Sequence, residues 1–460
     1  MKNITLSLPI FATTLIIISG CSRKVDVASF GASPLADAAV NTQAIARALE
    51  GGGKTVTITT PGTYLLEETL LLEDNTTLKC SPGVVLKKAR PYSFVLSNAG
   101  ASTRTTNHDI RIIGATIDAD DKYSNDLTIQ DAQLGCRGQI DLFHVRDVLI
   151  KDVTIYGIVS SEATGIQICS WENIRIKNAR IHTCGDALHI NRGRRLRVED
   201  SEFCSGDDNI PLNAKDWVSS APEVGDITDV VFKNVTCIPH ENPHGNVARH
   251  LVGSWTDWHK GMVVRMGDCV VNAGHTYVAI TGPRFMPGID DIRGYHPGDA
   301  MEYISLTAPD CDSDTAWMED EGGFIWKFEQ EDECYHANIE NIRYKNVRFT
   351  DDRQIIMAYY DTSGVSDRSF HPDTPRENYP FIKNVVFDGV SSNSDLFIGI
   401  HSAPNMSFDY RIKNVGRFPE KSRMMRIIGT VAGGTLRIDG KALEDGHKVE
   451  VPDNVTVIRE

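Results

Sequence analysis

The sequence lacks the features that mark several common classes of protein. Its 460 residues carry a net charge of −15, which argues against nucleic acid or an anionic membrane surface as the main partner. None of its cysteines forms a Cys-x-x-Cys pair, so a zinc site is not expected. Beyond the N-terminal segment, no stretch is apolar enough to cross a bilayer. We therefore expect no nucleic-acid partner, no bound metal and no cofactor.

Residues 1–21 have the pattern of a bacterial export signal. Lys2 supplies the positive charge, and Ile4–Ile18 is the apolar stretch, which is short for a membrane span. The last four residues, "ISGC", resemble the bacterial lipobox, whose cysteine becomes the lipidated first residue of the mature protein. We therefore expect a monomer of the bacterial cell envelope, attached to the membrane only through a lipid on Cys21.

The remaining cysteines number nine, which is odd for an exported chain. Four of them, Cys169, Cys204, Cys237 and Cys269, lie at or near the ends of strand-like segments. We expect buried thiols rather than a disulfide framework.

One strand pattern recurs along the chain: an Asn or Asp, alternating aliphatic residues, a polar pair and another aliphatic residue. Period-two alternation with many β-branched residues predicts strands. The copies begin at His108, Arg146, Glu172, Arg194, Thr228, Glu340 and Ile382, with a degenerate copy at Met262. The first aliphatic residues of five copies are 26, 22, 34 and 34 residues apart: Val148, Ile174, Leu196, Val230 and Val264.

Repeats that each contain a strand but no helix cannot bury a hydrophobic face alone, so they must stack. An antiparallel sandwich would need frequent two-residue hairpin turns, and these are sparse here. We therefore predict an all-β protein that folds as a single-stranded right-handed parallel β-helix. Its inward ladders would include Ile174, Ile176, Leu196, Val198, Val230 and Phe232.

The predicted β-helix domain spans residues 22–435, with long loop insertions over 245–335. Residues 41–50 have helical spacing with Asn41 as the N-cap, and the glycines at 51–53 end the helix. This helix would cap the N-terminal end of the β-helix. Residues 436–460 are predicted to form short closing strands.

Three acidic residues have matching positions in two neighbouring repeats. Asp186 lies 12 residues after Ile174, and Asp208 lies 12 residues after Leu196, with Asp207 beside it. Equal offsets stack about 4.8 Å apart in a parallel coil. Carboxylates this close cannot all ionise freely, so at least one pKa should rise, which gives an acid and a base in one cleft. The alternative is structural, because Gly-Asp is common in turns and both Asp186 and Asp207 follow a glycine.

These motifs resemble those of the polygalacturonases, glycoside hydrolase family 28 of the pectin-lyase-like superfamily. "GDD" at 206–208 matches the family's Gly-Asp-Asp, and "CGD" at 184–186 stands for its Asn-Thr-Asp with two residues changed. The N-terminal segments "VDVASFGASP" and "NTQAIARAL" are also similar. The resemblance implies a polysaccharide substrate, including pectic ones, and an inverting mechanism. Asp207 would be the general acid, and Asp186 and Asp208 would activate water, with about 6.5–9.5 Å between acid and base.

The family's other motifs are less distinct here. Its Gly-His-Gly could correspond to His244, on the expected coil, or to His275, at the right offset from Val264 but one coil later. The Arg-x-Lys that holds the substrate carboxylate has no convincing match. Candidates for substrate binding are Arg284, Arg293 and Lys327.

Two other functions remain open from the sequence. A polysaccharide lyase on the same fold would remove a proton beside a uronate carboxylate and would not need the three aspartates in this register. A non-catalytic glycan-binding β-helix lipoprotein would bind its glycan without turnover.

Overall fold

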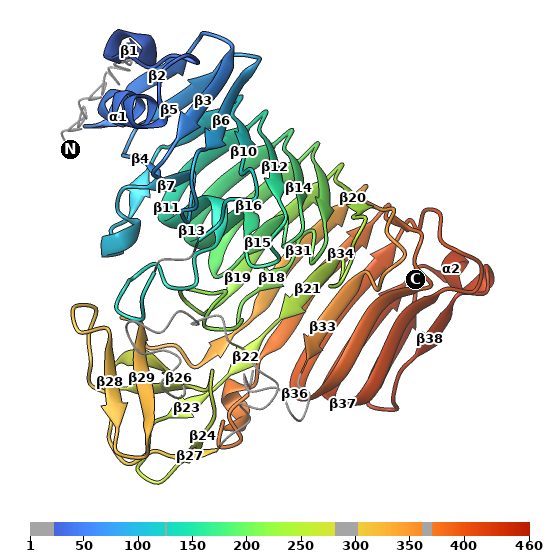
Figure 1. Ribbon diagram of the computed structural model, residues 1–460. Coiled ribbons are helices and arrows are strands. Elements are labelled where there is room, and N and C mark those ends of the chain that lie inside the picture. The colour runs from blue at the N-terminus through green and yellow to red at the C-terminus, as the bar shows by residue number, and fades with distance from the viewer. Residues whose placement is uncertain (1–22, 125–126, 281–301, 361–369) are drawn as a thin grey trace, which may run out of the picture.

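The computed structural model describes residues 23–124, 127–280, 302–360 and 370–460 (Figure 1). Cys21, Arg284 and Arg293 lie outside the described residues. Within these four ranges, no helix combines the length and the apolar character that a membrane crossing requires.

The chain forms a right-handed parallel β-helix, as the repeats predict (Figure 1). Among the described residues, 21 strands join into one large sheet. They are β1 (Arg23–Asp26), β2 (Lys54–Ile58), β4 (Leu70–Leu72), β5 (Thr77–Cys80), β7 (Leu96–Asn98), β8 (Asn107–His108), β9 (Arg111–Ile113), β11 (Gly138–Lys151), β13 (Thr164–Lys177), β15 (Leu188–Ile190), β16 (Gly193–Glu199), β18 (Leu212–Asn213), β19 (Ile227–Lys233), β21 (Ala248–Leu251), β31 (Ile339–Lys345), β33 (Ile356–Tyr360), β34 (Phe381–Asp388), β36 (Leu396–Lys413), β37 (Arg423–Ile438), β38 (Lys448–Glu450) and β39 (Val455–Arg459).

A second parallel sheet completes the coils and has nine strands within the described ranges. They are β3 (Gly62–Leu66), β6 (Val84–Lys88), β10 (Thr116–Asp118), β12 (Thr154–Ile158), β14 (Arg180–Thr183), β17 (Glu202–Ser205), β20 (Thr236–Pro239), β32 (Arg348–Phe349) and β35 (Ser391–Ser392).

Long strands of the large sheet contribute to two neighbouring faces of the β-helix. The first half of β11 pairs with β7, and its second half pairs with β9. Between the halves, His144 has a φ of 54°, a left-handed conformation that redirects the chain, and Ser170 does the same in β13 with a φ of 50°.

The predicted inward ladders are confirmed by the register of the strands. Ile174 lies opposite Leu196, which lies opposite Val230, and the second row runs from Ile176 through Val198 to Phe232. These side chains are at most 1% exposed. The core therefore lies inside the coils, and each layer buries the face of the next.

The Asn or Asp that recurs in each repeat has a backbone role. These residues adopt positive φ inside strands of the large sheet, as at Asp147 (57°) in β11, Asn173 (58°) in β13 and Asp229 (59°) in β19. Asn and Asp tolerate this conformation better than other side chains. Their amides also bond from coil to coil, as where Asn341 Nδ2 donates to Asp229 Oδ1 at 3.1 Å.

Helix α1 (Ala38–Leu49) lies at the N-terminal end of the β-helix (Figure 1). The predicted start was wrong, since the N-cap is Asp37 and Asn41 is a buried residue inside the helix. Asn41 accepts a hydrogen bond from Ser33 N at 2.9 Å and so joins the helix to the preceding segment. Its polar side chain was mistaken for a cap because a cap and a buried bridge look alike in sequence.

The C-terminal residues close the other end. Strands β38 and β39 both pair parallel with β37, and the predicted boundary at 435 falls inside β37. A short helix, α2 (Gly440–Glu444), separates them from β37. The described 3₁₀ helices are η1 (Val27–Phe30), η2 (Ala101–Thr103) and η4 (Arg376–Asn378).

Between β21 and β31 the chain leaves the β-helix and forms an insertion (Figure 1). One sheet of the insertion contains β23 (Thr256–Asp257), β25 (Cys269–Asn272), β26 (His275–Ile280), β28 (Trp317–Asp320) and β29 (Phe324–Gln330). Two small antiparallel pairs join β22 (Gly253–Ser254) with β30 (His336–Ala337) and β24 (Val263–Val264) with β27 (Tyr303–Ile304).

The repeat predicted at Met262 is therefore wrong. Val264 pairs antiparallel with Tyr303, and β19 pairs directly with β31, placing Val230 opposite Ile342. Alternating hydrophobicity is the same in parallel and antiparallel strands, so the pattern could not separate them.

All nine cysteines in the described part of the chain are free thiols, and seven are buried. The expectation of buried thiols in place of disulfides agrees with this arrangement.

We predict that truncating one inward ladder residue destabilises the whole stack. Ile176 is fully buried between Ile150 and Val198. Ile176→Ala should cost about 2–5 kcal/mol, because the neighbouring coils cannot collapse onto the cavity. The control Ile428→Ala removes a side chain that is 44% exposed and should change stability by no more than about 0.5 kcal/mol. Thermal or urea unfolding of both variants measures this, and equal stability of the two would contradict the assigned ladders.

Candidate active site

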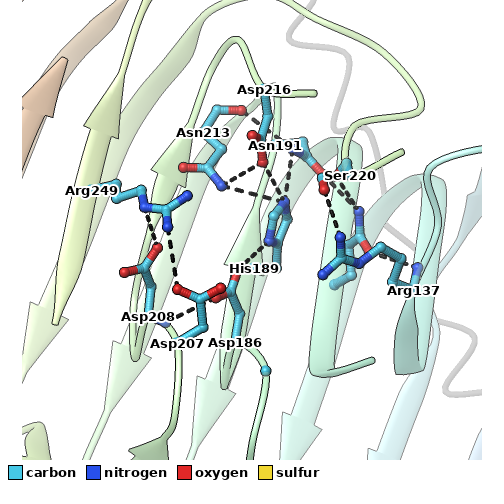
Figure 2. Close-up of polar contacts among 12 residues, drawn as sticks. Arg137, Asp186, His189, Asn191, Asp207, Asp208, Asn213, Asp216, Ser220 and Arg249 are labelled. Atoms are coloured by element: carbon cyan, nitrogen blue, oxygen red, sulfur yellow. Dashed lines mark hydrogen bonds and ion pairs between the residues drawn. The ribbon is translucent and has the colours of Figure 1, made fainter. Parts of the chain in front are cut away.

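A cleft runs beside strands β13, β15 and β18, where successive coils enter the large sheet (Figure 2). Its volume is about 290 Å³. It is lined by Arg137, Ser161, Glu162, Asp186, His189, Asp207, Asp216, Trp217, Ser219, Ser220, His244 and Arg249.

Three glycines shape this cleft by letting coils approach closely. A Cβ atom on Gly185 would lie 2.2 Å from Ala163 O, and one on Gly206 would lie 2.4 Å from Cys184 O. A Cβ on Gly245 would lie 1.9 Å from Asp207 Oδ1. The glycines are therefore needed for contact between coils, whereas the sequence suggested tight turns.

The structure brings Asp186, Asp207 and Asp208 together, as the equal offsets predict. Asp208 N donates to Asp186 Oδ1 at 2.9 Å. Each of the three side chains has an oxygen within 4.8 Å of the other two. These oxygens are closer than the separation of about 6.5–9.5 Å expected for an inverting acid and base, so that predicted gap is not found among them.

Asp186 is held by a buried histidine that lies between two carboxylates (Figure 2). His189 Nδ1 lies 2.5 Å from Asp186 Oδ2, and Nε2 lies 3.4 Å from Asp216 Oδ2. Burial alone would lower the pKa of His189, but its bonds to these two carboxylates raise it to about 9. His189 is therefore an imidazolium ion at neutral pH.

The same contact fixes the charge of Asp186. Burial alone would raise the pKa of Asp186, but the hydrogen bond from His189 and the positive charge of His189 lower it to about 2. Asp186 is therefore an anion whose two oxygens both accept hydrogen bonds, one from His189 and one from Asp208 N.

Arg249 lies between the other two acids. Its Nη2 donates to Asp207 Oδ1 at 3.2 Å, and its Nε lies 2.6 Å from Asp208 Oδ2 without the alignment of a hydrogen bond. Burial and then the charge of Asp186 raise the pKa of Asp207. Burial raises the pKa of Asp208 well above its ordinary value, even beside Arg249. The resemblance implies that Asp208 activates water, and its raised pKa disfavours the ionised form that this role needs.

Charged groups of both signs line the cleft. Three cations line the cleft: Arg137, His189 and Arg249. Asp186 and Asp216, both with lowered pKa values, supply two negative charges. The pKa values of Asp207 and Asp208 are both raised by burial, so a negative charge is less favoured on these two carboxyl groups than on Asp186. Glu162, 3.9 Å from Arg137, is 41% exposed and screened by solvent.

The three carboxylates offer oxygens at a spacing that suits a cation. Arg249 already supplies a positive charge at that place, 2.6 Å from Asp208 and 3.2 Å from Asp207. A metal ion would have to displace this guanidinium.

The histidine candidates separate clearly. His244 lines the cleft, with Nε2 at 3.9 Å from Asp207 Oδ2. His275 begins β26 of the insertion, where its Nδ1 contacts Glu331 O at 3.1 Å, and it does not line the cleft. The offset from Val264 that favoured His275 has no meaning, because Val264 is not part of a coil.

Of the three basic candidates, Lys327 lies in the described part of the chain, and it does not line the cleft. Lys327 is 2% exposed and its Nζ lies 3.0 Å from Glu329 Oε2, so it forms a closed pair inside the insertion. Arg284 and Arg293 lie outside the described residues.

Five charged residues of the cleft were missed in the sequence: Arg137, Glu162, His189, Asp216 and Arg249. His189 follows Asp186 by three residues, and this spacing was a signal that could have been followed. Arg249 lies one coil after the acids, next to His250, which is opposite Leu212 in the register. Arg137 and Asp216 come from segments outside the repeats, where no periodicity marks them.

No protein-family model matches the sequence, and no curated protein matches it. Solved structures of similar shape include the family 28 exopolygalacturonase of Yersinia enterocolitica, which is 13% identical, with 89% of this chain and 78% of that chain covered and a TM-score of 0.45. A hyperthermoactive exopolygalacturonase from Thermotoga maritima is 11% identical, with 95% and 92% covered and a TM-score of 0.45.

The ORF18 protein of Geobacillus virus E2 is 12% identical, with 89% of this chain covered and a TM-score of 0.46. The match covers 62% of the viral chain, so this chain spans less than two thirds of its length. These identities leave the activity to be argued from the cleft itself.

We predict that His189 makes stability depend on pH in two directions. Its pKa is raised from 6.5 to about 9, so its bonds to the carboxylates stabilise the fold fully below pH 6.5 and are lost as pH rises through about 9. The pKa of Asp186 is lowered from 3.8 to about 2, so its contribution is present above pH 3.8 and is lost as pH falls through about 2.

Thermal unfolding of the wild type and of His189→Gln across pH 4–10 measures the loss of stability at alkaline pH. We expect this loss between the two pKa values of about 6.5 and 9. The variant should melt lower at neutral pH and should lose the wild-type decline between those values. His259→Gln, whose side chain is 55% exposed, is the matched control and should follow the wild type. Parallel curves for wild type and His189→Gln would refute the assigned charge.

Proposed function

We propose that the protein is a glycoside hydrolase that cleaves a polysaccharide with Asp207 as the proton donor. The observation that carries this proposal is the cluster of Asp186, Asp207 and Asp208, in which the pKa of Asp186 is lowered while the pKa values of Asp207 and Asp208 are raised. Glycosidic bond cleavage needs such a pair of unequal carboxyl groups.

Asp207 is the member of the cluster that can reach a substrate. Its side chain is 25% exposed and lines the cleft, whereas the side chain of Asp208 is fully buried. Burial and the neighbouring anion Asp186 raise the pKa of Asp207, which favours its protonated form. Asp207 is thus suited to protonate the leaving oxygen.

Asp186 is suited to orient water rather than to attack the sugar. Both of its oxygens accept hydrogen bonds from the protein, which lowers their reactivity toward carbon. The transition state resembles an oxocarbenium ion, so the attacking water needs orientation more than a strong base. This favours inversion, despite oxygens that approach within 4.8 Å.

Pectic polysaccharides are the first substrates to test, because the aspartate motifs resemble those of polygalacturonases. The lipobox-like "ISGC" ending at Cys21 supports a place in the bacterial cell envelope.

We predict that Asp207→Asn lowers turnover by about 10²–10⁴-fold, the usual contribution of a positioned proton donor, with little loss of stability. Wild type and variant would be assayed by release of reducing ends from a panel of pectic and other glycans. Asp395→Asn is the control, since its side chain is 76% exposed and pairs with Arg423 across a 3.4 Å contact. Full activity of Asp207→Asn would remove this residue from the mechanism.

The products distinguish the alternatives. Proton nuclear magnetic resonance of the first product should show the inverted anomer and no new double bond. An unsaturated product that absorbs ultraviolet light would show a lyase, and tight binding without any product would show a glycan-binding protein.

A further inference from the structure

Two segments close one end of the cleft. We define the seam as the contact between segment 127–137, which precedes β11, and segment 214–224, which follows β18. Arg137 Nη1 donates to Ser220 Oγ at 2.6 Å (Figure 2). Beneath them Gln167 Nε2 donates to both Gly135 O at 2.9 Å and Ser220 O at 3.0 Å. Gln167 is fully buried, so the seam is closed to solvent at this point.

Gly135 shows how tight the seam is. It has a φ of 96°, and a Cβ atom there would lie 2.7 Å from Ala221 C and 2.9 Å from Val218 O. Leu134, Val218 and Ala221 are at most 3% exposed. The two segments are therefore packed backbone to backbone, with no passage between them for a sugar chain.

The seam lies across the direction of the cleft. Ser161, Asp186, Asp207 and His244 line the cleft from successive coils, so the cleft follows the axis of the β-helix. Arg137 marks its N-terminal end. Beyond segment 127–137 there is a separate cavity of about 280 Å³, lined in part by Ser97, Leu127 and Gln133. One face of the β-helix is thus divided in two by the seam.

The size of the cleft agrees with this division. Its volume of about 290 Å³ is just below the range of about 300–1,000 Å³ for small-ligand pockets. A groove that holds the interior of a polymer must be open at both ends. This cleft stops at Arg137, next to the catalytic aspartates.

We infer that the protein acts on the ends of polysaccharide chains, with the terminal sugar held between the aspartates and the seam. This rests on the proposed hydrolase function and adds its mode of action. A chain that enters along the axis must end where segments 127–137 and 214–224 meet, so internal bonds cannot reach Asp207.

The wild-type product pattern tests this inference. Polygalacturonate and its trimer, with xylan and xylotriose as a second pair, would be digested and sampled from the first minutes. One short product should appear from the start, and viscosity should fall only as mass is lost. A ladder of long products with a rapid fall in viscosity would overturn chain-end action while leaving the hydrolase function intact. Failure to cleave or bind any glycan of the wider panel would contradict the proposed function, and this inference would fall with it.

Binding separates the two questions further. Calorimetry with Asp207→Asn would compare each polymer with its trimer at equal sugar content. If chain ends are recognised, the trimer should bind far more protein per sugar unit than the polymer does, because it has many more chain ends at the same sugar content. Equal binding per sugar would overturn the inference even for a protein without turnover.

A variant of the seam gives an independent readout. Gly135→Ala forces Ala221 and Val218 away and should add longer products to the wild-type pattern. Gly446→Ala is the matched control, because its φ of 85° imposes the same backbone strain with no atom near the new Cβ. A folded Gly135→Ala with the unchanged wild-type pattern would count against the seam as the determinant. If that variant does not fold, the wild-type pattern decides.

Discussion

Unbroken parallel pairing between successive coils is the constraint on which the rest of this structure depends. Leu196 lies between Ile174 and Val230 because the backbones keep the same register from one coil to the next. That register also places Asp208 beside Asp186, and it requires glycine at 185 and 206, where one coil touches another. The fold and the cluster of acids thus follow from one periodicity, and a shift of a single residue would break both.

The stacking that builds the cluster also creates its electrostatic problem. Three carboxylates within 4.8 Å would repel one another if all were ionised. Two cations reduce this repulsion: Arg249 lies between Asp207 and Asp208, and His189 lies between Asp186 and Asp216. Because each cation contacts different acids, the three acids differ in pKa and therefore in charge. This difference lets one carboxyl group act as an acid and another as a base.

The coils and the acid cluster could be predicted from the sequence because both are periodic. Alternation gave the strands, and equal offsets gave Asp186 over Asp208. Alternation failed at Met262, where an antiparallel insertion has the same hydrophobic pattern as a coil. His275 became a candidate because its offset was counted from this wrongly assigned repeat. Arg137, Asp216 and the seam come from irregular segments between strands. Their positions depend on contacts such as Arg137 with Ser220, 83 residues apart, which no local pattern records.

The central claim is that the pKa of Asp186 is lowered while the pKa values of Asp207 and Asp208 are raised, so the three acids of one cluster differ in charge. Carbon-13 nuclear magnetic resonance of aspartate carboxyl groups tests it directly, with Asp186→Asn, Asp207→Asn and Asp208→Asn used to assign the signals. We predict that Asp186 titrates near pH 2 and that Asp207 and Asp208 titrate above the ordinary value of 3.8, with each affected by replacement of the other. Three independent titrations near pH 3.8 would contradict the account.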